Sequence, residues 1–366
     1  MLGVTFLANK GKALSTLSPS QVAILDTSIT QVLSHLDLRS LARQRLFITG
    51  GTGFFGIWLL TALRVLNRQG VALQVTVLSR NPEAFLQRHQ QFRGQSWLSF
   101  LAGDVCDFSI PLQAFDLLLH AATETSMAAH AEPTRMFDNI VYGTRQVLEL
   151  ARKCGIRRVL LVSSGAVYGR QPPHQIHQSE DSQLACNPLV ASSAYGEGKR
   201  VMELMGAMLQ QEIGIECVTA RCFAFCGPGL PLDGHFAIGN FVRDALYREQ
   251  ITVHGDGSPL RSYLYGADLA VWLLYLLLNG AAGGAYNVGN DQALTIKDLA
   301  VRVRDALSPG KPIEIQHAPE EASKSSLNCY VPAIDRARGL GCRPWTTLDQ
   351  SLEFTANYWL RSKLSA

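Results

Sequence analysis

The sequence predicts an α/β fold in which a doubly wound parallel sheet is joined to a smaller, mixed C-terminal part. Two observations predict it: short apolar runs alternate with helical patterns, and this rhythm breaks into loops rich in Gly and Pro after Arg221. The chain has 366 residues, of which 47% are hydrophobic and 17% charged, enough for a large core in two domains or one large one. This composition excludes a disordered, collagenous or coiled-coil chain.

The strands that we expect are apolar along most of their length, as is typical of parallel strands covered by helices on both faces. They are Arg45–Thr49, Leu73–Ser79, Trp97–Leu101, Phe115–His120, Arg158–Ser163 and Ile215–Arg221. Helical patterns lie between them at Phe55–Asn67, Met136–Cys154 and Tyr195–Glu212. Strand, helix and strand at this spacing predict right-handed crossovers within one sheet.

A glycine-rich turn, RLFITGGTGFFG, joins the first strand to the first of these helices. Gly50 permits a tight turn, Gly53 lets the backbone approach a pyrophosphate, and Gly56 lets the helix pack against the sheet. The free N–H groups and the dipole of the helix N-terminus then hold the phosphates. No Gly-Lys-Ser/Thr follows, so a Walker-type nucleotide site is not expected. The turn therefore predicts a Rossmann-type dinucleotide site.

The expected cofactor preference depends on the end of the second strand. A site specific for NAD usually carries Asp or Glu there, to bind the ribose hydroxyls. Ser79 offers no anion, and Arg80 would attract a 2′-phosphate, so NADP is favoured over NAD. The cofactor-binding residues that we expect are Gly50, Thr52, Gly53, Phe54, Phe55, Gly56, Ser79, Arg80, Asp104, Val105, Ala121, Ala122, Thr123, Tyr195, Lys199 and Phe223.

Four polar residues are candidates for catalysis. Tyr195 and Lys199 are four residues apart in a helical pattern, so both project from one face. The ordinary pKa of a tyrosine is about 10, and a nearby ammonium together with the positive charge of a nicotinamide favours the phenolate that a base requires. Ser164 follows the fifth strand, at the edge where ligands bind, and is expected to hold the substrate oxygen. Asn139 is expected to anchor a proton-relay water.

Eight segments of the sequence occur in an order that resembles one known family, the extended short-chain dehydrogenases/reductases that act as NAD(P)-dependent nucleotide-sugar epimerases and dehydratases. The segments are TGGTGFFG (49–56), GDV (103–105), HAA (120–122), NIVYGT (139–144), VSSGAVYG (162–169), YGEGK (195–199), GPG (227–229) and GDGSPLRSYLY (255–265). The resemblance implies catalytic Ser164, Tyr195 and Lys199, a bound nicotinamide dinucleotide and a nucleoside-diphosphate hexose. It also implies a homodimer formed by Met136–Cys154 and Tyr195–Glu212.

The resemblance also implies how a sugar nucleotide would be held. Arg261 matches a diphosphate-binding arginine, and Tyr263 lies close enough to contact the base. The family commonly has Asn at the position of Ala224, so Asn240 or His235 is a candidate substitute donor. Glu124 is either an acid/base or a ligand of a sugar hydroxyl. The expected substrate-binding residues are Glu124, Thr125, Ser126, Asn240, Arg261 and Tyr263.

The reaction depends on the two residues before Val167-Tyr168-Gly169. Resembling 4,6-dehydratases carry an Asp-Glu pair there, glucuronate decarboxylases a Glu, and GDP-fucose synthases a Cys, whereas this chain has Gly165 and Ala166. Neither side chain moves a proton. We therefore expect a 4-epimerase or a 4-ketoreductase in surface polysaccharide or O-antigen sugar synthesis. The alternatives are a nucleotide-sugar 4,6-dehydratase, an NADP-dependent reductase of a hydrophobic ketone, and a non-enzymatic dinucleotide-sensing module.

The expected domain organisation follows from these motifs. Residues 1–44 form a helical extension around the amphipathic segment Val22–Leu41. The NAD(P)-binding domain takes residues 45–172, 190–226 and 262–288. The substrate-binding part takes residues 173–189, 227–261 and 289–366.

Charge, cysteine content and hydropathy indicate which ligands, compartments and membrane contacts are not expected. The net charge is +3 with no basic block, so no nucleic-acid surface is expected. The eight cysteines form no CxxC pair, so we expect no metal, and reduced thiols fit the cytoplasm. The N-terminus lacks the pattern of a signal peptide. The apolar stretch Leu269–Leu278 has about ten residues, whereas a membrane span needs about 20, so we expect a buried helix and no membrane contact.

Overall fold

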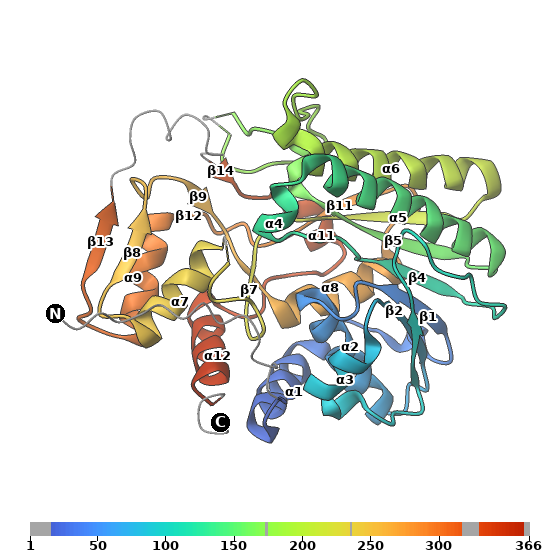
Figure 1. Ribbon diagram of the computed structural model, residues 1–366, viewed down its shortest axis with the longest axis horizontal. Helices are drawn as coiled ribbons and strands as arrows, with labels where there is room; N and C mark the ends of the chain where they lie inside the picture. The colour runs from blue at the N-terminus through green and yellow to red at the C-terminus, as the bar shows by residue number, and fades with distance from the viewer. Residues whose placement is uncertain (1–15, 173–174, 235, 317–328, 362–366) are drawn as a thin grey trace.

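The computed structural model describes residues 16–172, 175–234, 236–316 and 329–361 (Figure 1). Its central element is a seven-stranded sheet with the order β11-β6-β5-β4-β1-β2-β3, in which every neighbouring pair is parallel. The strands are β1 (Arg45–Thr49), β2 (Gln74–Ser79), β3 (Leu98–Ala102), β4 (Leu117–His120), β5 (Arg158–Ser164), β6 (Glu216–Cys222) and β11 (Ala285–Val288). The doubly wound parallel fold is confirmed, and each of the six expected strands lies within two residues of its predicted ends.

Helices cover both faces of this sheet. The helices of the described residues, of which α7, α9 and α12 pack with the small strands of the C-terminal part, are α1 (Pro19–Leu33), α2 (Phe54–Arg68), α3 (Pro82–Arg88), α4 (Met127–His130), α5 (Pro133–Lys153), α6 (Ala194–Ile213), α7 (Ala237–Tyr247), α8 (Gly266–Asn279), α9 (Ile296–Leu307), α11 (Asp335–Gly339) and α12 (Leu348–Arg361). Side chains alternate along β1, so that Leu46 and Ile48 enter one apolar cluster with α2 and α8, while Phe47 enters a second one with α5 and α6. Figure 1 shows α5 and α6 side by side over their face.

The C-terminal part contains three small sheets, which is the mixed architecture that the sequence predicts. Their strands are β7 (Phe225–Cys226), β8 (Ile251–His254), β9 (Leu260–Arg261), β10 (Leu264–Tyr265), β12 (Leu294–Thr295), β13 (Ile313–Gln316) and β14 (Cys329–Tyr330). The pairs are β10 with β7, β13 with β8, and β9 between β12 and β14. The last sheet is mixed, because β9 runs antiparallel to β12 and parallel to β14.

The N-terminal extension is shorter as a helix than the sequence predicts. Ser18 and Gln21 form a capping box at the start of α1, but the helix ends at Leu33 and does not reach Leu41. Asp37 accepts a hydrogen bond from the backbone N–H of Arg39 at 2.9 Å, and a separate 3-10 turn begins there. A short acidic side chain that bonds the backbone locally competes with helix continuation, which explains the break.

Helix α1 is integrated into the core by polar contacts as well as apolar packing. Ser28 hydrogen-bonds the hydroxyl of Tyr265 at 2.8 Å, and Asp26 forms an ion pair with the buried Arg64 of α2. Its apolar side packs against α2, α8 and α12. The helix therefore closes the face of the domain that α2 and α8 cover. The buried helix expected around Leu269–Leu278 is α8, and none of the described helices has the length and apolarity needed to span a membrane.

Replacing Leu25 tests the contribution of α1 to stability. Leu25 is 1% exposed, so Leu25→Ala should lower the free energy of unfolding by about 2–5 kcal/mol, measured by urea denaturation. The control Thr27→Ala alters an exposed position of the same helix and should change it by less than about 0.5 kcal/mol. Equal stability of the two variants would contradict the integration of α1 into the core.

Candidate active site

The glycine turn lies where the strand order reverses, between β1 and β4. Gly50 has φ +74°, and a Cβ there would lie 2.6 Å from the backbone of Ala121, so glycine is required on two grounds. A Cβ on Gly56 would lie 2.1 Å from the backbone carbon of Gly51, which shows how closely α2 packs on the turn. At Gly53, by contrast, a Cβ would meet nothing closer than 3.7 Å.

The same turn fits a dinucleotide. No side chain caps α2 at Gly53, so its first backbone N–H groups face the open side of the turn, as a pyrophosphate site requires. Ligands of doubly wound sheets bind at this reversal of strand order, at the carboxyl ends of the strands. Thr52, Phe54 and Phe55 belong to the same turn and helix start.

The expected adenosine-side residues lie at the ends of β2 and β3. Ser79 is buried, whereas the Arg80 side chain is 72% exposed and its Nη1 lies 4.0 Å from Oε2 of Glu124. Asp104 is exposed and accepts a hydrogen bond from the backbone of Cys106, and Val105 contacts Gly143 of α5. Arg80 is therefore accessible to an anion, although a carboxylate is already close to it.

A buried polar chain joins β1, β4 and α5 beneath the turn. Nδ1 of His120 lies 2.7 Å from Oγ1 of Thr49, and its Nε2 lies 3.3 Å from Oγ1 of Thr144. Thr49 also accepts a hydrogen bond from the backbone N–H of Ala122. Burial, with a smaller contribution from the charge of Lys199, lowers the pKa of His120 to about 3, so the imidazole is neutral. Its two nitrogens then fix the position of the residues that follow β4.

Lys199 lies on the sheet side of α6 and is buried. Its Nζ donates hydrogen bonds to Oγ1 of Thr123 at 2.8 Å and to the carbonyl oxygen of Val162 at 2.7 Å. Burial lowers the pKa of Lys199 to about 8, while Cys222 and Glu203 oppose this shift. The ammonium is thus held between the ends of β4 and β5, next to the expected nicotinamide-side residues Ala121, Ala122 and Thr123.

Tyr195 lies one helical turn before Lys199, with its ring edge-on to His130 of α4 at 5.6 Å between centroids. Burial raises the pKa of Tyr195 to about 12, and a hydrogen bond with Ser164 acts in the opposite direction. That the ammonium of Lys199 favours the phenolate stays a prediction for the enzyme with cofactor bound, because burial dominates the pKa of Tyr195 in the protein alone. A lowered pKa at Tyr195 would therefore need the positive charge of a bound nicotinamide.

Ser164 ends β5 and contacts a residue that the sequence analysis missed. Its Oγ lies 3.3 Å from the hydroxyl of Tyr330 in β14 and accepts a hydrogen bond from the backbone N–H of Ala166. The ring of Tyr330 packs on Phe223, with centroids 4.7 Å apart. Tyr330 belongs to no motif, and a two-residue strand is too short for periodicity to reveal it.

A partly buried ionic network lies beneath this edge. Ser163 donates a hydrogen bond to Glu203 at 2.5 Å, and Glu203 also pairs with Arg221 at 2.7 Å. Arg221 donates to the hydroxyl of Tyr168, which donates in turn to Asn287 of β11. Only Ser164 of the two serines faces the candidate site, because Ser163 is committed to this network.

The two positions that separate the reactions of the family carry no acid or base. A Cβ on Gly165 would lie 2.7 Å from the Phe223 ring, so no side chain fits there without rearrangement. The carbonyl oxygen of Ala166 accepts a hydrogen bond from Sγ of Cys186 at 3.0 Å. An acidic side chain at position 165 would therefore require the Phe223 ring to shift.

The expected diphosphate site lies in the small β12-β9-β14 sheet. Arg261 of β9 is the register partner of Tyr330, so this sheet brings it toward the Ser164 edge. Burial lowers the pKa of Arg261, while Tyr263 and Tyr330 oppose the shift. Tyr263 is 8% exposed. A buried guanidinium of this kind is stabilised by an anionic ligand.

Two other expected site residues lie on α5 and α7. Asn139 is exposed on α5, with its Oδ1 3.8 Å from Sγ of Cys106, and lines an open hollow of about 520 Å³ with Arg135 and Tyr142. Asn240 lies on α7 and accepts a hydrogen bond from Arg243. His235 lies outside the described residues.

Glu124, Thr125 and Ser126 follow the end of β4. Ser126 donates a hydrogen bond to Glu124 and caps α4 by accepting one from Ala129. Glu124 is therefore a solvent-exposed carboxylate between Arg80 and Ser126.

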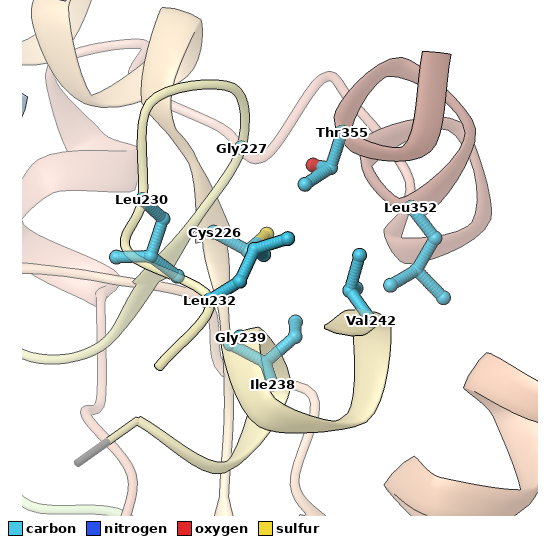
Figure 2. A pocket seen from close by; sticks show the side chains of 9 residues that line it. All are labelled: Cys226, Gly227, Leu230, Leu232, Ile238, Gly239, Val242, Leu352 and Thr355. Atoms are coloured by element: carbon cyan, nitrogen blue, oxygen red, sulfur yellow. The ribbon is translucent and has the colours of Figure 1, made fainter. Parts of the chain in front are cut away.

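A small cavity lies away from the site, between the loop after β7, α7 and α12 (Figure 2). Its lining is apolar apart from Cys226 and Thr355, and Thr355 is satisfied by the carbonyl oxygen of Ser351. Its volume of about 10 Å³ is no more than one water molecule needs, so the cavity is too small for a ligand. Within the ranges that the structure describes, no group of three or more His, Cys, Asp or Glu side chains is arranged to hold a metal ion.

The fold and the glycine turn define a protein of the extended short-chain dehydrogenase/reductase class. The model of the NAD dependent epimerase/dehydratase family matches residues 46–289, and the chain belongs to this family. The family that the motifs resemble is thereby confirmed.

Two relatives found by sequence are named as UDP-glucuronic acid decarboxylases. UDP-glucuronic acid decarboxylase 1 of Danio rerio is 30% identical over 87% of this chain and 73% of its own length. UDP-glucuronic acid decarboxylase 6 of Arabidopsis thaliana is 29% identical, covering 85% of this chain and 87% of its own.

Solved structures show the same fold. UDP-glucose 4-epimerase of Thermotoga maritima, solved with UDP-glucose, matches with a TM-score of 0.74 at 21% identity, covering 87% of this chain and 99% of its own. The dTDP-glucose 4,6-dehydratase DesIV of Streptomyces venezuelae, solved with NAD, matches with a TM-score of 0.75 at 24% identity over 88% and 98% of the two chains.

Two glycine variants separate folding from cofactor binding. Gly53→Ala should keep the free energy of unfolding within about 1 kcal/mol of wild type, because its Cβ meets no close atom, but should weaken NADH or NADPH binding at least about tenfold. Fluorescence titration measures this affinity. Gly56→Ala should instead lower stability by about 1–3 kcal/mol, because its Cβ meets backbone. Unchanged cofactor affinity in Gly53→Ala would contradict the close backbone approach.

Burial of His120 predicts a pH dependence of stability. Between its ordinary pKa of 6.5 and its folded value of about 3, the unfolded chain binds a proton that the folded chain does not. The free energy of unfolding therefore falls as the pH falls through this window, by up to about 1.4 kcal/mol per pH unit from this group. Between pH 7 and pH 4.5, urea denaturation should show a smaller decrease in the free energy of unfolding for His120→Gln than for wild type. The exposed control His254→Gln should follow wild type, and a fall equal to wild type in His120→Gln would refute a neutral buried His120.

Proposed function

We propose that the protein oxidises and reduces a nucleotide-linked sugar at C4. The observation that carries this proposal is the meeting of Tyr195, Lys199 and Ser164 at the carboxyl edge of the sheet, beside the open side of the Gly53 turn. Membership of the family supports it, since both named solved structures above act on nucleotide sugars.

Each of the three residues has a role in the proposed reaction. Tyr195 takes the proton of the C4 hydroxyl and returns it when the carbonyl is reduced. Ser164 donates a hydrogen bond to the C4 oxygen, and Lys199, held by Thr123 and Val162, supplies a positive charge at the edge where charge develops. A bound nicotinamide supplies the exchange of hydride with C4.

Arg261 favours a nucleoside diphosphate over a hydrophobic ketone as substrate. Its sheet lies toward the Ser164 edge, and the planar fork of guanidinium donors matches the oxygens of a diphosphate. A hydrophobic ketone carries no anionic group for a guanidinium to bind. Tyr263, two residues further on, is available for contact with the base.

Gly165 and Ala166 favour a 4-epimerase or a 4-ketoreductase over an elimination. A 4,6-dehydratase needs a further acid and base, and the Phe223 ring occupies the space that a side chain at position 165 would need. UDP-glucuronate is nevertheless a necessary test substrate, because the relatives found by sequence are named as its decarboxylases. Synthesis of surface polysaccharide or O-antigen sugars is the process that we propose for the product.

The remaining proposals concern cofactor, assembly and compartment. NADP is the proposed cofactor because Arg80 is exposed at the end of β2 and Ser79 is not an anion. A homodimer is proposed through α5 and α6, whose Tyr142, Leu204 and Met208 are 56%, 59% and 49% exposed, and sedimentation analysis tests it. All eight cysteines are unpaired, which fits the cytoplasm.

A panel of nucleotide sugars tests the proposed function. We expect wild-type protein, loaded with NAD or NADP, to exchange C4 stereochemistry or to reduce a 4-keto sugar with NADPH, as followed by mass and NMR. Tyr195→Phe should lower this rate at least about 100-fold, because the base is lost while the ring remains. Tyr275→Phe on α8 is the matched control and should retain the wild-type rate.

Other products would contradict the proposal in distinguishable ways. Rapid formation of a 4-keto-6-deoxy sugar would establish a dehydratase. Release of CO₂ from UDP-glucuronate would establish a decarboxylase that works without Glu at position 166. A thermal shift with an aromatic ketone and none with UDP-, dTDP-, GDP- or CDP-sugars would favour the ketone reductase.

A further inference from the structure

Two charged side chains of α6 hold the end of β5 at consecutive residues. Lys199 and Glu203 are one helical turn apart, so both lie on the side of α6 that faces the sheet. Nζ of Lys199 donates a hydrogen bond to the carbonyl oxygen of Val162 at 2.7 Å. The hydroxyl of the next residue, Ser163, donates to Oε1 of Glu203 at 2.5 Å. Helix α6 is therefore tied to β5 at the two residues that precede Ser164.

Arg221 of β6 fixes the same carboxylate from the neighbouring strand. It is the register partner of Ser163, so both side chains rise from the sheet toward α6. Its Nη2 donates to Oε2 of Glu203 at 2.7 Å, and its Nε donates to Oε1 at 3.1 Å. Two parallel bonds of this kind make a strong arginine–carboxylate pair. The side chains of Arg221 and Glu203 are 17% and 15% exposed, so water and salt screen the pair weakly.

The rest of the Arg221 side chain is bonded as well. Its Nη1 donates to the hydroxyl of Tyr168 at 2.9 Å and to the carbonyl oxygen of Glu180 at 3.3 Å. The guanidinium also lies over the Tyr168 ring, 4.9 Å from its centre. The Tyr168 hydroxyl donates in turn to Asn287 at 2.8 Å. Arg221, and with it the Glu203 carboxylate, is therefore held in one orientation.

Three other titratable groups lie around Lys199, and they are uncharged at neutral pH. Burial lowers the pKa of His120 of β4 to about 3, and it raises the pKa of the Cys222 thiol of β6. Burial also raises the pKa of Tyr195, in the preceding turn of α6, to about 12. Glu203 is paired as a carboxylate, and its charge opposes the burial that lowers the pKa of Lys199 to about 8.

We propose that Glu203 is a positioning residue that acts through Lys199: its carboxylate, fixed by Ser163 and Arg221, keeps the Lys199 side chain charged and in place between the ends of β4 and β5. Arg221 limits this effect, because the guanidinium neutralises part of the Glu203 charge. The importance of this charge for catalysis rests on the proposed function, in which Lys199 supplies a positive charge at the reacting edge.

The test follows the titration of Lys199 in protein labelled with ¹³Cε-lysine, without cofactor or sugar. The Lys199 resonance is assigned by its loss in Lys199→Met. In Glu203→Gln, the midpoint of this titration should fall by at least about half a pH unit, because a negative charge is removed and Arg221 loses its counter-charge. In Arg221→Gln, the midpoint should rise by a similar amount, because the Glu203 charge is no longer neutralised.

Control variants separate the effect of charge from a loss of packing. Glu203→Asp and Arg221→Lys keep both charges, so the Lys199 midpoint should stay within about 0.3 pH unit of wild type. Glu216→Gln is the matched control, since the exposed Glu216 pairs with Arg158 at the opposite end of β6. It should leave the midpoint unchanged. Urea denaturation establishes that each variant is folded, and a packing defect alone would not shift Glu203→Gln and Arg221→Gln in opposite directions.

The second measurement is the pH dependence of nicotinamide reduction when the loaded enzyme is mixed with UDP-, dTDP-, GDP- and CDP-sugars. If the reaction needs the ammonium form of Lys199, the alkaline midpoint of the rate should move down in Glu203→Gln and up in Arg221→Gln. Above the wild-type midpoint, the rate of Glu203→Gln should be about three- to tenfold below that of wild type.

The outcomes distinguish this inference from the proposed function. An unchanged or raised Lys199 midpoint in Glu203→Gln, or shifts of the same sign in Glu203→Gln and Arg221→Gln, overturn the role of Glu203. If one of these variants does not fold, the sign of the shift in the other decides. An alkaline midpoint of the rate that stays fixed while the resonance moves also overturns it. If no nucleotide sugar reduces the nicotinamide, the proposed function fails, and the resonance still decides whether Glu203 keeps Lys199 charged.

Discussion

The close approach of two chain segments at the reversal of strand order is the constraint on which the rest of the site depends. The turn after β1 passes so near the end of β4 that a Cβ on Gly50 would lie 2.6 Å from Ala121. On one side of this contact lies the helix start at Gly53, which no side chain caps, and on the other Thr123 accepts a hydrogen bond from the Lys199 ammonium. A bulkier turn would separate the phosphate-binding and catalytic halves of the site.

Two different kinds of polar contact hold the catalytic edge. Below it, Ser163, Glu203 and Arg221 form a partly buried network that anchors α6 to β5 and β6. At the surface of the edge, the Oγ of Ser164 accepts a hydrogen bond from the backbone N–H of Ala166 and lies 3.3 Å from the Tyr330 hydroxyl. The first contact joins a helix to two strands of the main sheet, and the second joins β5 to the small C-terminal sheet.

The sequence was most informative where a physical requirement is local. The apolar runs predicted six of the seven strands of the main sheet, because parallel strands covered on both faces need no polar alternation, but they did not predict the short edge strand β11. The spacing of Tyr195 and Lys199 placed both on one side of α6, since helical geometry alone relates positions four apart. The amphipathic pattern of Val22–Leu41 overran the true end of α1, because a local Asp37 contact interrupts the helix without changing the apolar periodicity.

The sequence by itself determined six strands of the main sheet, the glycine turn and the family, because each depends on neighbouring residues or on a regular period. Only the tertiary structure decided that Tyr330 lies at Ser164, that Phe223 fills the space above Gly165, and that burial raises the pKa of Tyr195. These features arise where segments separated by up to 166 residues pack together and exclude water. Neither desolvation nor a contact between distant segments leaves a pattern in the local sequence.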